Sequence, residues 1–322
     1  MNDRGSLWRG PLGHRCRASI GAPKVRVSPH SWENLTMRRT LQALSILTSL
    51  ALAAPCLAAT PCQRPASLPR KEFRQLTPAE WTAFSNAVLA LKREMRSETI
   101  STYDVLAKVL MDNGRSAQGN ASFLPWHRRY LKELESNLRR VSGNAAITIP
   151  YWDTERDSQV PSASPLFTNA FMGGNGPVST GVFAGWRPAY PSAHPLLRQF
   201  DNGSGISAWQ SVEVVRSIVS TTTSYDVFRT RVESGNHARV HTGIGGDMAG
   251  TQAANDPIFW LAEANTDRIW DQWQKANRGV NASKYGGRNA TAATAALTDR
   301  LNPWANTVAD VMAAENLGYC YQ

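Results

Sequence analysis

The feature that most constrains the fold is a series of helix starts and helix ends along the chain. Thr77-Pro78-Ala79-Glu80 forms a capping box with proline at the first helical position, a pattern that begins a helix. Apolar residues then recur at helical spacing, at Trp81, Phe84, Val88, Leu91 and Met95. The same criteria predict helices from Ser101, at 124–141, at 225–233, near 236–241 and at 256–277. The chain is therefore expected to be mainly α, with a central bundle of helices.

Single residues mark the ends of two predicted helices. Gly143 follows the helix at 124–141, and Gly279 follows the last helix, which begins with Asp256 as N-cap and Pro257 at the first position. Residues 147–152 form a short apolar piece that leads into Asp153. Residues 155–206 are rich in Pro, Gly, Ser and Asn and lack a periodic apolar pattern. We predict a long irregular excursion there, inside one domain that covers residues 60–322.

The first 59 residues are organised like an export signal. Met37-Arg38-Arg39 precedes an apolar run at 41–52, and small residues continue through Ala58-Ala59. This order is typical of a secretory signal, and the run is shorter than the roughly 20 residues of a membrane-spanning helix. We interpret residues 37–59 as a signal for export to the periplasm or beyond, with Arg38-Arg39 also fitting a twin-arginine exporter. Residues 1–36 are interpreted as an unstructured upstream extension, with Met37 as an alternative start.

The net charge of +10 belongs mostly to this leader. Residues 1–59 contain eight Lys/Arg and two Asp/Glu, whereas the rest of the chain contains 27 and 23. The mature part is only mildly basic, and its sequence has no run of Lys/Arg interleaved with aromatic residues. We therefore expect no nucleic-acid partner and, once the signal is removed, no membrane partner.

Two of the four cysteines remain in the mature chain. Cys16 and Cys56 lie in the leader, and Cys62 and Cys320 lie near the two ends of the mature part. Domain termini are often close in space, and an oxidising compartment permits a bridge. We predict a Cys62–Cys320 disulfide, with two free thiols as the alternative.

Four histidines lie outside the leader. His237 and His241 stand four residues apart on a predicted helix, so their side chains share one face and suit one metal ion. His127 lies near a helix start among Trp and Pro, where the simpler interpretation is a hydrogen-bonded core residue. His194 lies in the irregular excursion, where a surface loop is the simpler interpretation.

Several longer motifs carry a family resemblance. They are Phe123-Leu-Pro-Trp-His-Arg-Arg-Tyr-Leu-Lys-Glu, His237-Ala-Arg-Val-His241 with Ile244-Gly-Gly-Asp-Met248, and Asp256-Pro-Ile-Phe-Trp-Leu-Ala-Glu-Ala-Asn-Thr-Asp267. They resemble, in order, the copper signatures of tyrosinases, catechol oxidases and molluscan hemocyanins. Arg70-Lys-Glu-Phe-Arg and Leu317-Gly-Tyr319-Cys-Tyr321 resemble the opening and closing segments of that family's core domain. The resemblance spans about residues 64–322 and implies a mainly α, tyrosinase-like fold around a four-helix bundle.

The resemblance implies two copper ions about 3.5–4 Å apart, each held by three neutral imidazoles. For the first copper, His127 matches the third ligand. The second falls nine residues earlier, on Gln118, and the first falls seven residues after Tyr103, on Leu110. Leucine has no ligand atom and a neutral amide is a poor ligand for Cu(I), so we expect this centre to be lost.

The second copper position is altered differently. His237 and His241 match its first two ligands, but Glu263 stands where the third histidine is expected, with Ala262 beside it. Ala238 replaces the asparagine that usually follows the first ligand. A set of two histidines and one carboxylate suits a single Cu, Zn, Fe or Mn ion. The alternative is a metal-free pocket in which Glu263 forms an ion pair with an arginine or a protonated histidine.

Three functional hypotheses follow from these substitutions. The first is an exported, mononuclear metal-dependent oxidoreductase that acts on a small phenolic or related substrate. The second is a non-catalytic binding or scaffold protein with the same fold, and the third is an ordinary tyrosinase or catechol oxidase. Asp256 is expected to cap a helix, and Asp267 to anchor an arginine or to support a ligand histidine from behind. The sequence ends at the Tyr-x-Tyr motif, so the pocket is expected to be open or to be covered by a separate partner.

Overall fold

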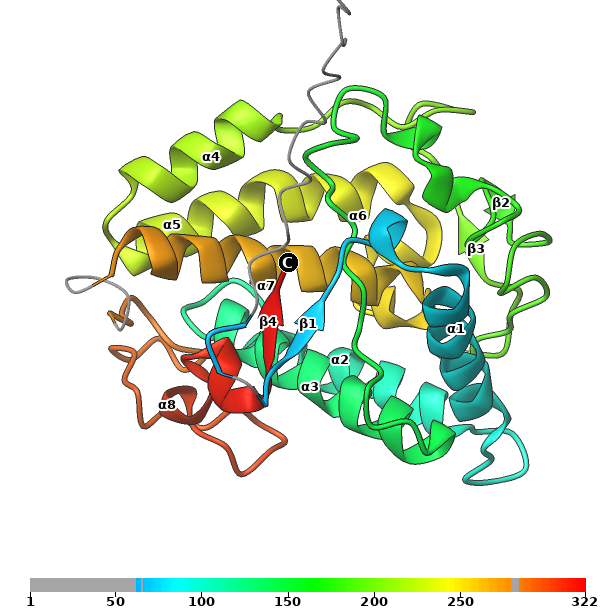
Figure 1. Cartoon of the computed structure of the whole chain (residues 1–322), viewed down its shortest axis with the longest axis horizontal. Coiled ribbons are helices and arrows are strands. Elements are labelled where there is room, and N and C mark those ends of the chain that lie inside the picture. The colour runs from blue at the N-terminus through cyan, green and yellow to red at the C-terminus, as the bar shows by residue number, and fades with distance from the viewer. Residues whose placement is uncertain (1–61, 65, 279–283) are drawn as a thin grey trace, which may run out of the picture. The chain divides into compact units, whose positions relative to one another are not determined.

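Helices form most of the regular structure in the computed structural model, which describes residues 62–64, 66–278 and 284–322 (Figure 1). These residues belong to one compact unit, Leu57–Gln322. The helices are α1 (Pro78–Arg93), α2 (Thr102–Ala117), α3 (Phe123–Ser142), α4 (Val212–Thr221), α5 (Tyr225–Val232), α6 (Ala238–Ile244), α7 (Ile258–Ala276) and α8 (Val308–Val311). The short strands are β1 (Leu68–Arg70), β2 (Gly176–Pro177), β3 (Leu197–Arg198) and β4 (Tyr319–Tyr321). The predicted mainly α class is confirmed.

The predicted helix starts coincide with real caps. Thr77 and Glu80 exchange both bonds of the capping box at the start of α1, and Ser101 does the same with Asp104 at α2. Gly143 ends α3 in a left-handed conformation with φ 67°. One apolar position was assigned wrongly, because α1 ends at Arg93 and Met95 lies beyond it with 51 % exposure.

Two further differences concern the later helices. Helix α4 was not predicted, because it lies directly after a stretch without apolar periodicity. Helix α7 begins at Ile258 with Pro257 at the N-cap, one residue later than predicted, although Asp256 still accepts a hydrogen bond from the Ile258 N–H. Gly279 lies outside the described residues, as do residues 1–59, for which an upstream extension and an export signal were predicted.

Helix α7 is the central element of the core. It packs against α3 and α4, and α3 also packs against α1 and α2 (Figure 1). Its indole and phenyl side chains are fully buried, at Phe259, Trp260, Trp270 and Trp273. The irregular region 155–206 has only short turns and the two-residue strands β2 and β3, and its buried Leu166, Phe183 and Trp186 join the main core. These side chains of the region are therefore part of the same core.

The two ends of the described part of the chain are tied together. Strands β1 and β4 pair in parallel, and Cys62 and Cys320 form the predicted disulfide. Next to β4, Asp267 of α7 accepts hydrogen bonds from Tyr319 and Tyr321 at 2.5 and 2.6 Å. Asp267 also pairs with Arg128 at 2.5 Å. The predicted anchoring of an arginine by Asp267 is thus confirmed, and the anchor joins α7, α3 and β4.

None of the described helices is both long enough and apolar enough to cross a membrane.

Candidate metal centre

Glu263 is the centre of a buried group of three histidines. It lies on α7 with no exposed surface, and its Oε1 lies 2.8 Å from His237 Nε2 and 3.0 Å from His241 Nε2. His237 ends a π-helical turn, Glu233–His237, and His241 follows one turn later in α6. His127, on α3, places its Nε2 4.0 Å from the other carboxylate oxygen, Oε2. The predicted His237, His241 and Glu263 set is therefore assembled, with ligand atoms within 4.8 Å of one another.

The outer ring nitrogens of these histidines have carbonyl partners. His127 Nδ1 lies 2.9 Å from the Phe123 oxygen, and His241 Nδ1 lies 2.8 Å from the Met248 oxygen. His237 is likewise hydrogen-bonded to the backbone of Glu233. A carbonyl oxygen only accepts, so each of these contacts keeps a proton on the imidazole nitrogen that it faces. In a neutral ring the remaining nitrogen carries a lone pair, and for all three rings that nitrogen is Nε2, which faces Glu263.

A carboxylate and three lone pairs repel one another unless a cation lies among them. In the metal-free molecule that cation is a proton. Burial lowers the pKa of His237, but Glu263 outweighs burial and raises it above its usual value. Burial raises the pKa of Glu263, but the facing imidazoles outweigh burial and hold it well below its usual range. Burial lowers the pKa of His127 despite the opposing charge of Glu263.

Two atoms in this group have no hydrogen-bond partner within the described residues. They are His127 Nε2 and Glu263 Oε2, both buried and both facing the interior of the group. Unpaired buried polar atoms are rare and costly in native proteins. A divalent ion bound by Glu263 and the histidines would satisfy both atoms, so the residues present fit one metal ion.

Comparisons with known proteins point to one family. Residues 94–276 match the common central domain of tyrosinase. The tyrosinase of Streptomyces glaucescens is 33 % identical over 262 residues, which cover 74 % of this chain and 93 % of the relative. The tyrosinase of Streptomyces antibioticus is also 33 % identical, over 263 residues, with the same two coverages. This chain belongs to the tyrosinase family.

Solved structures show the same fold. A polyphenol oxidase variant from Thermothelomyces thermophila superposes with a TM-score of 0.62 at 23 % identity, covering 79 % of this chain and 88 % of that one. A functional unit of octopus hemocyanin superposes with a TM-score of 0.58 at 21 % identity, covering 80 % and 68 %. The tyrosinase-like fold is therefore confirmed.

The tyrosinase-family positions for the first copper do not provide a second site. Leu110 is fully buried in the apolar core, and Gln118 is the C-cap of α2. Only His127 remains of the three expected ligands. The residues present therefore do not fit a second ion with a three-histidine shell.

Other predicted positions lie around the second site. Ala238 is the first residue of α6 and Ala262 lines a small cavity beside the histidines, so neither adds a ligand atom. Glu263 contacts the three histidines, and its ion pairs among the described residues include no arginine. His194 belongs elsewhere, because its Nε2 lies 2.9 Å from Asp247 and its side chain is 29 % exposed.

The cavity beside His237 and His241 has a volume of about 10 Å³. The rest of its wall consists of Thr154, Asn236, Thr266, Ala262 and three larger apolar side chains, Val232, Val240 and Ile269. This volume is close to the minimum for one water molecule. The side chains of His237 and His241 are 9 and 10 % exposed, which leaves the site a narrow contact with solvent.

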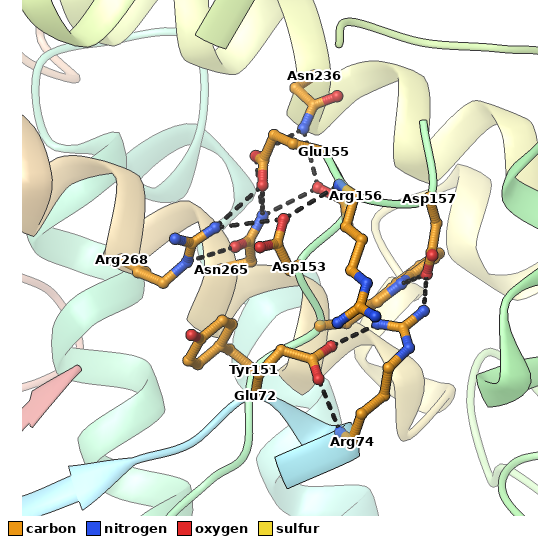
Figure 2. Close-up of polar contacts among 12 residues, drawn as sticks. Glu72, Arg74, Tyr151, Asp153, Glu155, Arg156, Asp157, Asn236, Asn265 and Arg268 are labelled. Atoms are coloured by element: carbon orange, nitrogen blue, oxygen red, sulfur yellow. Dashed lines mark hydrogen bonds and ion pairs between the residues drawn. The ribbon is translucent and has the colours of Figure 1, made fainter. Parts of the chain in front are cut away.

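Sequence reasoning missed the polar residues behind the ligands. Thr154, Glu155, Asn236 and Asn265 form a buried hydrogen-bond cluster, and Asn236 and Asn265 are close in sequence to His237 and Glu263. Figure 2 shows Glu155, Asn236 and Asn265 of this cluster. Thr154-Glu155 directly follows the apolar piece that ends at Trp152-Asp153, and neither residue has a spacing that indicates a site. Only the packing of three separate segments brings these side chains together.

Proposed function

We propose that this tyrosinase-family protein binds a single divalent metal ion through His237, His241 and Glu263, with His127 facing the same carboxylate. It is then an exported, mononuclear metal-dependent oxidoreductase that acts on a small phenolic or related substrate. Three histidine Nε2 atoms converge on the buried carboxylate of Glu263, and this supports the proposal. One cation would remove the repulsion between the carboxylate and the nitrogen lone pairs, and it would give a partner to the two unpaired atoms, His127 Nε2 and Glu263 Oε2.

Copper follows from the family, and the donor set also suits iron or zinc. A bound ion would supply one-electron redox chemistry in the case of Cu or Fe, or Lewis acidity in the case of Zn. The chain's own residues orient the ligands, because the carbonyls of Met248 and Phe123 fix the ring orientations of His241 and His127. Two-copper chemistry of the family type is not expected, since Leu110 and Gln118 do not hold the first ion.

The small cavity favours a second candidate function. A volume of about 10 Å³ beside His237 and His241 admits a water-sized molecule but not a phenol ring. A phenolic substrate therefore requires Val232, Val240 or Ile269 to move away from the site. If these three side chains do not move, the protein is a non-catalytic member of the family. Its metal ion then stabilises the fold or takes part in binding.

Metal analysis of the mature protein tests these alternatives. We expect one ion per chain after separate loading with Cu, Zn and Fe, and loss of that ion in Glu263→Ala. Asp256→Asn is the matched control, because Asp256 is buried against Arg198 near the start of the same helix and contacts no ligand histidine. It is expected to keep the ion.

The other outcomes discriminate sharply. Two coppers per chain with oxygen-dependent diphenol oxidation would overturn the proposal in favour of an ordinary tyrosinase. No metal under any loading condition would leave the non-catalytic alternative. One ion with no turnover of monophenols, diphenols or aminophenols would favour the metal-binding, non-catalytic form.

Export is supported by the disulfide between Cys62 and Cys320, since such bonds persist in oxidising compartments. Expression of the full chain in a bacterial host, followed by fractionation and N-terminal sequencing, tests it. Recovery outside the cytoplasm with a new N-terminus near residue 60 is expected, and an uncleaved cytoplasmic product would contradict it.

A further inference from the structure

Thr154 and Glu155, which follow Trp152 closely in the sequence, both accept hydrogen bonds from the side-chain amides of Asn236 and Asn265. Thr154 Oγ1 accepts hydrogen bonds from Nδ2 of Asn236 and of Asn265, both at 2.9 Å. Glu155 Oε1 accepts from the same two Nδ2 atoms, at 3.1 and 3.0 Å. Figure 2 shows Glu155 between Asn236 on one side and Asn265 on the other. All four residues are at most 4 % exposed, so water does not substitute for these bonds.

Each amide belongs to a segment that carries a candidate ligand. Asn236 directly precedes His237 at the end of the π-helical turn, and Asn265 follows Glu263 by two residues on α7. Because both amides bind the same pair of acceptors, their separation is fixed by the size of one hydroxyl and one carboxylate. The separation of His237 from Glu263 is fixed with it.

The acceptors themselves are held firmly. The Trp152 N–H donates to the Leu261 carbonyl at 3.1 Å, which holds the segment on α7. Trp209 Nε1 donates to the Thr154 carbonyl at 2.7 Å. Arg268 Nη2 lies 3.1 Å from Glu155 Oε2. Trp209 thus anchors Thr154 independently of the two amides, whereas Arg268 also donates to Asn265 Oδ1, at 2.9 Å.

We propose that Thr154 and Glu155 are positioning residues of the metal site and act as a clamp that sets the distance between His237 and Glu263. This inference rests on the proposed metal-binding function and extends it to residues that contact no ion. Thr154 has a further position in the site, because it lines the small cavity shared with His237 and His241.

Glu155 also lies at the wall of a second, larger cavity. Asp153, Glu155, Arg216 and Arg268 line a hollow of about 380 Å³ against α4. Burial raises the pKa of Glu155, Arg268 partly lowers it, and a hydrogen bond with Asp153 raises it further, to about 7. Arg156 adds a positive charge beside Asp153.

A donor–acceptor exchange tests the clamp. Glu155→Gln turns an acceptor that faces Asn265 and Arg268 into a possible donor, so the clamp should loosen. We expect about 10-fold weaker Co(II) or Zn(II) affinity, the lower end for residues behind metal ligands, and a changed Co(II) absorption spectrum. When Glu155→Gln is combined with Asn265→Asp, the amide at position 155 donates to the carboxylate at position 265, so the pair again has one donor facing one acceptor. This pair should recover most of the affinity and the original spectrum.

A control separates positioning from loss of stability. Asp256→Asn breaks the buried pair with Arg198 on the same helix but leaves the clamp intact. It should lower the melting temperature and leave the Co(II) spectrum unchanged. A Glu155→Gln protein with the affinity and spectrum of the parent would overturn the clamp, as would a spectrum in which both variants change alike.

The clamp is testable even if the parent protein binds no metal, an outcome that would refute only the proposed function. In the metal-free crystal structure of Glu155→Gln, we expect the 2.8 Å contact between His237 Nε2 and Glu263 Oε1 to open beyond hydrogen-bond distance. The same contact should be retained in the exchanged pair. An unchanged contact in Glu155→Gln would contradict the clamp directly.

Discussion

Glu263 Oε1 accepts from His237 Nε2 at 2.8 Å, whereas Glu263 Oε2 faces His127 Nε2 at 4.0 Å without a hydrogen bond. One carboxylate thus presents one oxygen to His237 and His241 and the other oxygen to His127. Oε1 is hydrogen-bonded to His237 and His241, whereas Oε2, near His127, has no hydrogen-bond partner among the described residues. His237, His241 and Glu263 would hold a single ion at this site, and His127 would offer a further imidazole nitrogen.

The lost copper ligands predict a restoration experiment. Leu110→His, Gln118→His and Glu263→His together rebuild the six-histidine pattern implied by the family motifs. We expect two coppers per chain and an oxygen-dependent charge-transfer absorption after reduction and exposure to air. Leu110 is fully buried in the core, so its replacement alone should cost about 2–5 kcal/mol of unfolding free energy. A folded triple variant with fewer than two coppers would show that more than ligands has changed.

The Asp267 anchor predicts a large stability effect. Asp267→Asn keeps the shape of the side chain but removes the charge that faces Arg128 and Arg70. Breaking a buried pair on one side leaves an uncompensated charge, so we expect a loss of about 3–5 kcal/mol in chemical denaturation. Asp112→Asn is the matched control, because its pair with Lys108 is on the surface. The control should change stability little, and equal losses in both variants would refute the assignment.

Glu155 predicts a pH dependence of stability. Its pKa is raised to about 7 in the folded protein, from an unfolded value near 4.5. The folded state therefore holds more protons between these values, and this contribution to stability is complete below pH 4.5 and is lost as pH rises through 7. We expect a decline of about 1–3 kcal/mol over this window. Glu155→Gln should flatten the curve measured by urea denaturation from pH 5 to 8, and an identical slope in both proteins would contradict the prediction.

The disulfide predicts a redox-dependent stability. Cys62–Cys320 closes a loop across a sequence separation of 258 residues, and constraining the unfolded chain in this way is worth about 2–5 kcal/mol. Cys62→Ser with Cys320→Ser should lower the unfolding free energy by this amount and remove its sensitivity to reductant. The β1–β4 pairing remains in this variant, so the native fold is expected to persist. A parent protein equally stable with and without reductant would argue against the bridge.

The fold was largely predictable because its signals are local. Capping boxes at Thr77 and Ser101 and the glycine at Gly143 set helix ends through hydrogen bonds within a few residues. Helix α4 was missed because it follows an aperiodic stretch and its apolar side chains are buried by distant parts of the chain, including Trp270 and Trp273. Met95 was misplaced because periodicity alone does not reveal where a helix stops.

For the candidate site, too, the motifs predicted one part, and the other part depends on the packing of distant segments. The candidate ligands could be identified from the motifs, whose order assigns His127, His237, His241 and Glu263 to copper positions and places Leu110 and Gln118 at two others. How these groups meet depends on the packing of the helices: both His237 and His241 face one oxygen of Glu263, and His127 faces the other. It also brought Thr154 and Glu155 between Asn236 and Asn265. The physical reason is that buried polar contacts between segments far apart in the chain depend on packing, which leaves no periodic signal in the sequence.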